Sequence, residues 1–161
     1  MTEPAHTVAS EFAACFEEVA AKIHKWVDPL STEQLWRNPF SHGNCIGHLL
    51  LHLNGNLNYY IGAQIAGTGY IRNRDREFTE ADRPDKESVL ANFDRVIQMV
   101  ADTIRKQSPE DWSRAYSAER STKKNRFAIV LNCAAHADHH AGQIIYLSRE
   151  LTTPASRSAA N

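Results

Sequence analysis

The chain has 161 residues, of which 42% are hydrophobic and 23% are charged, and its formal net charge is −1. This length suits a single domain with a sizeable buried core. The balanced charge and the lack of a concentrated basic face exclude the electrostatic footprint of a nucleic-acid-binding protein. No apolar stretch approaches the ~18–20 uncharged residues that span a bilayer, and the N-terminus does not resemble a secretory signal. We therefore expect a cytoplasmic protein with no membrane partner.

Apolar residues recur at helical spacing in four long segments, and turn residues separate these segments. Capping residues such as Ser31, Asn44, Asp85 and Ser108 stand where helices are expected to begin. The expected long helices cover residues 7–27, 44–66, 85–107 and 127–151, with short helical turns after Ser31 and Ser108. With no alternating strand pattern, these segments predict an all-α four-helix bundle over residues 1–152, followed by a disordered tail, 153–161.

A long loop is expected between the second and third helices, from Tyr70 to Asp85, and it contains the charged run RNRDREF. It is longer than usual helix connections, so it is either functional or poorly ordered. The three cysteines, Cys15, Cys45 and Cys133, are far apart in sequence, which favours reduced thiols over a disulfide framework.

Histidines form the most distinctive pattern in the chain. His136 and His140 are four residues apart on the expected fourth helix, so both imidazoles project from one face and could bind one metal ion. His139 lies about 100° around the axis from His140 and should not join them. Ala137 stands where metalloprotease helices carry a glutamate, so that chemistry is not expected.

The expected second helix offers a third ligand, because His48 and His52 are also four residues apart. His52 lies closer to the core edge than His48 by about 40°, whereas His48 is expected at the rim. A hydrogen-bonded boundary histidine is the alternative interpretation of His52.

The segments HLLLHLNGNLNYYI and HADHHAGQIIYLSRE resemble the DinB-like superfamily. A His-Leu-x-Gly-Asn motif and a later Arg-Asn-Arg-Asp motif resemble one poorly characterised branch of it. The resemblance implies a four-helix bundle with metal ligands at His52, His136 and His140. It also implies an activity among those of the superfamily, which includes metal-dependent transferases and isomerases that use low-molecular-weight thiols, and many members of no known activity.

Three imidazoles would leave a divalent ion, whether zinc, nickel, manganese or iron, with an open position at which a water or a thiol could ionise. A hydrolase would need a general base near that position, and no carboxylate lies on the ligand stripe of either helix. We therefore expect a thiol-dependent transferase acting on a small-molecule substrate. The alternatives are a metal-dependent hydrolase and a non-catalytic metal-binding bundle, and a homodimer is expected.

Several other side chains could serve such a site. Arg72, Arg74 and Arg76 could bind the carboxylates of a thiol cofactor or substrate, or could simply be solvated. Cys133 could be a fourth ligand, but a small core residue is the favoured interpretation. Asn56, Tyr60 and Gln143 could supply polar contacts near the ion or could make core hydrogen bonds, while Asp138 is expected to face solvent.

Overall fold

The computed structural model describes residues 3–153, with side chains described from Thr7 onward, and every regular element in this range is a helix. The all-α prediction is confirmed for this part of the chain. Apart from Thr153, the predicted tail lies outside the described residues. The elements are α1 (Glu3–Val27), α2 (Thr32–Trp36), α3 (Ile46–Leu57), the π-helix η1 (Asn58–Ala66), α4 (Arg76–Thr79), α5 (Lys86–Arg105), α6 (Pro109–Ser113) and α7 (Arg126–Thr152).

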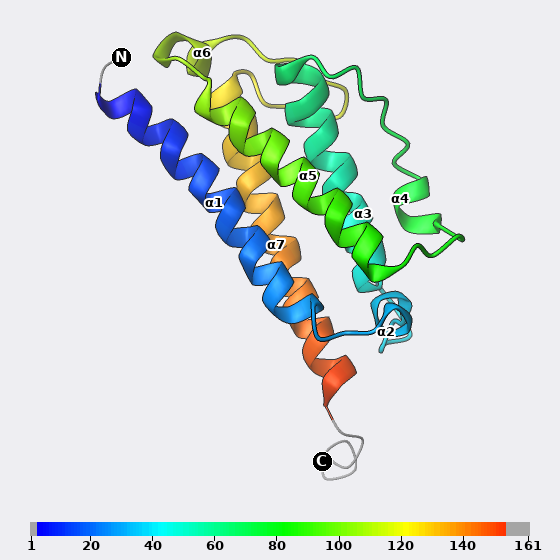
Figure 1. Ribbon diagram of the computed structural model, residues 1–161. Helices are drawn as coiled ribbons and strands as arrows, with labels where there is room; N and C mark the ends of the chain where they lie inside the picture. The colour runs from blue at the N-terminus through cyan, green and yellow to red at the C-terminus, as the bar shows by residue number, and fades with distance from the viewer. Residues whose placement is uncertain (1–2, 154–161) are drawn as a thin grey trace.

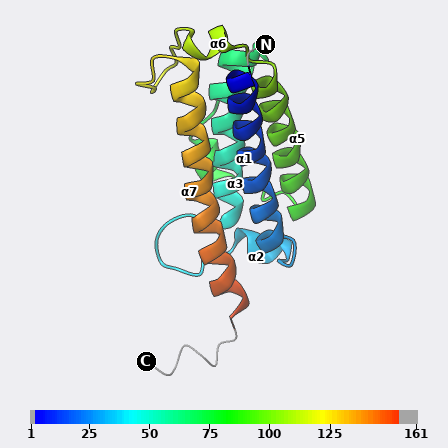
Figure 2. The same ribbon diagram turned by 90° about the vertical axis from the view of Figure 1, so that its left-hand side faces the viewer.

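The long helices lie side by side, with α3 and η1 continuing one another, as Figures 1 and 2 show from two directions. Helix α1 packs against α5 and α7, and α3 packs against the same two helices. Each contributes fully buried side chains to a common core, among them Phe16, Leu50, Phe93 and Ile129. Burying an apolar side chain of this size stabilises the fold by about 1.5–3 kcal/mol. No described helix is long and apolar enough to cross a membrane.

Helix starts follow the capping pattern of the sequence closely. Ser31 and Ser108 form capping boxes with Gln34 and Asp111, and Pro109 occupies the first position of α6. The Asp85 side chain accepts a hydrogen bond from the Ser88 backbone N–H. The start of α3 differs from the prediction of Asn44 as the cap, because Cys45 is the N-cap residue and makes no side-chain capping bond.

The second long helix changes its hydrogen-bonding pattern halfway along. The sequence predicts one α-helix over 44–66, whereas the structure has α3 followed by the nine-residue π-helix η1. Hydrophobic periodicity does not distinguish these patterns, since both keep an apolar face toward the core. Gly67, with φ of 69°, ends η1 in the left-handed conformation that glycine adopts without strain. The π-helix is rare, usually spans a single turn, and is frequent at functional sites.

The long connection between η1 and α5 folds back on the bundle. It contains the short helix α4, which packs against α3 (Figure 1). Glu77 in α4 is only 6% exposed, while Ile71 earlier in the connection is 90% exposed. The connection therefore contributes a buried carboxylate to the interior and an apolar side chain to the surface.

Candidate metal centre

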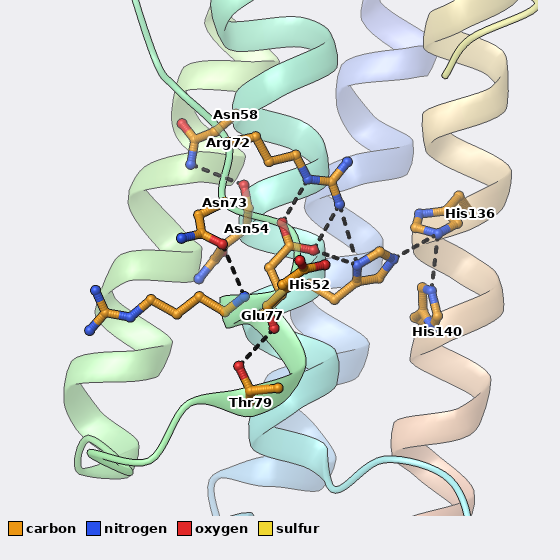
Figure 3. A network of polar contacts seen from close by, with 11 residues as sticks. His52, Asn54, Asn58, Arg72, Asn73, Glu77, Thr79, His136 and His140 are labelled. Carbon is orange, nitrogen blue, oxygen red and sulfur yellow. Dashed lines mark hydrogen bonds and ion pairs between the residues drawn. The ribbon is translucent and has the colours of Figure 1, made fainter. Parts of the chain in front are cut away.

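Three histidines from two helices meet between α3 and α7. The Nε2 atom of His136 lies 3.2 Å from Nε2 of His52 and 3.0 Å from Nε2 of His140. One ring nitrogen from each residue can be chosen so that all three lie within 4.8 Å of one another. Figure 3 shows His136 and His140 on one helix facing His52 across the gap. The structure thus brings together the three residues that the sequence singles out.

The helical repeat of α7 places two of these rings one turn apart. His136 and His140 are half-buried, and their ring centroids are 4.4 Å apart. Burial, followed by the neighbouring imidazoles, lowers the pKa of His136 to about 3. Burial likewise lowers the pKa of His140. Both rings are therefore neutral at pH 7, which is the form that binds metal ions.

His52 is held from behind by a buried ion pair that the sequence analysis missed. Its Nδ1 lies 2.8 Å from Oε2 of Glu77, and Arg72 binds the same carboxylate through Nε at 2.6 Å and Nη2 at 2.8 Å. Burial raises the pKa of Glu77, but the hydrogen bonds from Arg72 and His52 outweigh it and hold that pKa below its usual range. Glu77 is therefore a carboxylate at neutral pH.

Gly55 leaves the space in which the Glu77 side chain approaches His52. It lies one turn after His52 on α3, and a Cβ atom at this position would overlap the carboxylate group of Glu77. The glycine of the His52-Leu53-Asn54-Gly55-Asn56 motif thus provides space for the side chain that orients His52. A glycine in the middle of a helix costs stability, so its presence there was the one signal in the sequence for a close contact at this position.

Hydrogen bonding indicates which nitrogen of two rings carries a proton. A carboxylate only accepts, so the Nδ1 of His52 donates to Glu77, and in the neutral form of this ring Nε2 carries the lone pair. The Nδ1 of His140 lies 2.7 Å from the amide oxygen Oε1 of Gln143; since this oxygen also accepts, Nδ1 carries the proton and Nε2 of the neutral ring has the lone pair. Both lone pairs point toward Nε2 of His136. By contrast, Nδ1 of His136 is buried and has no hydrogen-bond partner among the described residues.

His48, His139 and Cys133 lie outside this cluster. His48 is half-buried, with its Nδ1 3.1 Å from the Cys45 thiol and its ring against Trp36. His139 is exposed and does not join the three ligand candidates, as the helical repeat predicts. Cys133 is fully buried, and burial raises its thiol pKa to about 12, which agrees with the interpretation as a core residue.

The other polar residues named from the sequence have different surroundings. Gln143 does contact a ring of the cluster, through His140. Tyr60 lies away from the imidazoles, under the guanidinium of Arg72, and its hydroxyl is 3.5 Å from the Glu119 carbonyl. Asn56 is buried, and its side-chain oxygen has no partner within the described part of the chain. Asp138 is exposed and pairs with Lys22, as expected for a solvent-facing residue.

The three loop arginines have different surroundings. Arg72 is committed to Glu77, and Arg76 pairs with Glu80 at 3.0 Å and Asp82 at 3.5 Å. Arg74 makes no ion pair with any described residue, and its guanidinium lies over the ring of Phe78. Of the three, Arg74 is the one whose donors are available to a ligand.

A family model covers almost the whole chain. It matches residues 5–159, and its description is "Protein of unknown function (DUF1572)". Neither the curated proteins nor the solved structures gave a match. The match spans the helices that carry the three clustered histidines and the ion pair behind them. The chain therefore belongs to the DUF1572 family.

Proposed function

We propose that this protein is a single-domain four-helix bundle of the DinB-like type that binds one divalent metal ion through His52, His136 and His140. We further propose that it is an enzyme, a transferase that uses a low-molecular-weight thiol. A divalent ion bound by the three imidazoles would supply Lewis-acid activation, because it would lower the pKa of a water or thiol at its open position. Zinc, nickel, manganese and iron all suit an imidazole site of this kind. The homodimer stays a prediction.

The observation that carries the proposal is the orientation of the ring protons. Glu77 and Gln143 hold protons on Nδ1 of His52 and His140, so that both rings present an unprotonated Nε2 to a common point. Carboxylates and amides on the far nitrogen of a ligand histidine are typical of metal sites, where they fix the tautomer and raise the basicity of the ligand.

The surroundings of the cluster favour thiol chemistry over hydrolysis. The one carboxylate that contacts a ring of the cluster, among the described residues, is Glu77. It lies on the Nδ1 side of His52 and is fully engaged by Arg72, so it does not face the point where the Nε2 atoms converge. A hydrolase would need a general base there, whereas a thiol that ionises at a metal needs none.

A purely structural metal site is the third candidate. Structural zinc sites usually have four protein ligands. Here the described histidine, cysteine and acidic residues provide three, and Cys133 is not among them. The ligand count therefore favours a site with an open position.

Metal analysis of the untagged protein tests the site directly. We expect near-stoichiometric metal by elemental mass spectrometry, and its loss in a His136→Ala/His140→Ala double variant. His139→Ala is the matched control, because that histidine is exposed on the same helix and outside the cluster; it should keep its metal. Wild-type protein that stays metal-free after reconstitution with zinc, nickel and manganese would refute the metal site.

Activity distinguishes the candidate reactions. With metal-loaded protein, we expect consumption of an electrophile that depends on an added biological thiol and disappears in the double variant. Turnover of activated esters without any thiol would instead support the hydrolase. Inactivity with several thiols and a broad electrophile panel would leave the non-catalytic bundle.

A further inference from the structure

A pocket of about 600 Å³ lies beside the histidine cluster and plays no part in the proposed metal binding. Its walls come from the start of η1, from the connection after η1 and from the turn before α7. Arg72 lines the pocket and also reaches within 3.4 Å of His52, so one side chain separates the two sites. The lining residues are Tyr59, Tyr60, Tyr70, Ile71, Arg72, Asn73, Arg74, Asp75, Glu119 and Arg120.

The aromatic part of this wall is held in place by hydrogen bonds. The Tyr59 hydroxyl accepts a bond of 3.2 Å from the Glu119 backbone N–H, which joins η1 to the turn before α7. The Tyr116 hydroxyl donates to the Tyr60 carbonyl at 3.0 Å. Tyr59, Tyr60, Tyr70 and the 90% exposed Ile71 thus give the pocket an aromatic and apolar wall that suits a planar apolar group.

The cationic part of the wall includes the guanidinium groups of Arg74 and Arg120. Arg74 has no ion-pair partner among the described residues, and its stacking on Phe78 holds it in place. Phe78 in turn packs on the ring of His52, with centroids 4.9 Å apart. Arg120 contacts its neighbour Glu119 at 3.8 Å, and both side chains are mostly exposed. Arg120 also has a φ of 62°, unusual for a non-glycine residue and frequent at ligand-binding positions.

Two carboxylates reduce the net positive charge of the pocket wall. Asp75 and Glu119 lie in the same wall as the arginines. A carboxylate could still bind an arginine there through two parallel hydrogen bonds. The wall thus combines a carboxylate-binding group with an aromatic surface for a planar group.

We propose that this pocket binds a small aromatic carboxylate, with its ring against Tyr59, Tyr60 and Tyr70 and its carboxylate on Arg74 and Arg120. This assignment rests on the proposed function. The pocket would then be the substrate subsite next to the metal, and Arg72 would form the wall between the two. The arginines of the long connection thereby have separate roles, since Arg72 orients Glu77 and Arg74 binds the ligand.

Calorimetric titration with 2-naphthoate tests the proposal in metal-loaded and in chelator-treated protein. We expect one saturable site in both forms, with a millimolar or tighter Kd, and at least tenfold weaker binding of the neutral 2-naphthamide. An Arg74→Gln/Arg120→Gln variant should bind 2-naphthoate at least tenfold more weakly. An Arg95→Gln/Lys106→Gln variant removes the same charge from α5 and its C-terminal end and should bind within about twofold of wild type.

Several outcomes would overturn the proposal that this pocket binds an aromatic carboxylate. These are equal binding of the amide, unchanged binding in the Arg74/Arg120 variant, or no saturation below ~10 mM. Binding that requires the metal and survives the arginine variant would place the carboxylate on the metal and also overturn it. Because chelator-treated protein is tested as well, failure of the pocket is distinguishable from failure of the metal site. A protein that takes up no metal on reconstitution and still binds 2-naphthoate through the two arginines would refute the metal site of the proposed function and leave the pocket standing.

Discussion

At the scale of single residues, Glu77 orients a ligand of the proposed centre while lying behind it. Replacing its carboxylate with an amide puts N–H donors where Arg72 and His52 both donate, so the His52 proton loses its fixed position. We expect Glu77→Gln to weaken zinc affinity by about 10- to 100-fold. Competition with a chelating dye measures this, and Glu80→Gln is the control, because Glu80 pairs with Arg76 in the same connection. Equal loss in both variants would contradict a specific role for Glu77.

Gly55 supplies the space that Glu77 occupies. An added methyl group would push the carboxylate away from His52, so we expect Gly55→Ala to lower the free energy of unfolding by about 1–3 kcal/mol and to weaken metal binding. Gly142→Ala is the matched control in α7, since a Cβ there meets nothing within 4 Å. The control should gain up to about 1 kcal/mol from its higher helix propensity. Urea unfolding of both variants measures the difference; a neutral Gly55→Ala would contradict the close approach.

At the scale of elements, His24 joins α1 to α5. Its Nε2 lies 2.7 Å from Asp94 in α5, and its Nδ1 lies 3.0 Å from Asp28 just after α1. Burial lowers the pKa of His24, but the bonds to Asp94 and Asp28 outweigh it and raise that pKa above its usual value. A raised pKa in the folded state stabilises the fold below the unfolded pKa, and this stabilisation is lost as pH rises through the folded pKa.

The contribution of this contact between α1 and α5 to the free energy of unfolding should therefore depend on pH. We expect His24→Gln to lower the free energy of unfolding more at about pH 6 than at about pH 8.5. Urea titrations of wild type and variant at the two pH values measure this, and subtracting the two removes the titration of the other histidines. Equal destabilisation at both pH values would show that the ring contributes by packing and not by charge.

At the scale of the whole molecule, a metal between α3 and α7 would stabilise the fold, because it binds the folded state only. A free metal concentration of 100 times Kd adds about 2.7 kcal/mol, which corresponds to a rise in Tm of about 5–10 °C for a chain of this length. Differential scanning fluorimetry with and without zinc measures the shift. The His136→Ala/His140→Ala variant should show none, and an equal shift in that variant would indicate metal binding elsewhere.

The sequence by itself determined the features that depend on neighbours within a few turns of helix. Helical periodicity and capping residues such as Ser31, Asp85 and Ser108 placed the helices, since caps and apolar stripes are local. The four-residue spacing of His136 and His140 put both rings on one face for the same reason. His52 was singled out over His48 because its position nearer the apolar stripe is also a local property.

Only the tertiary structure decided the contacts between distant segments. Glu77 reaches His52 from 25 positions further along the chain, through a connection whose charged sequence also suits a solvated loop. The same folding separates Arg72 from Arg74, which are two residues apart and have different partners. Local patterns do not encode which buried carboxylate will face a given imidazole, because that depends on how the connection packs against α3 and on the space left by Gly55.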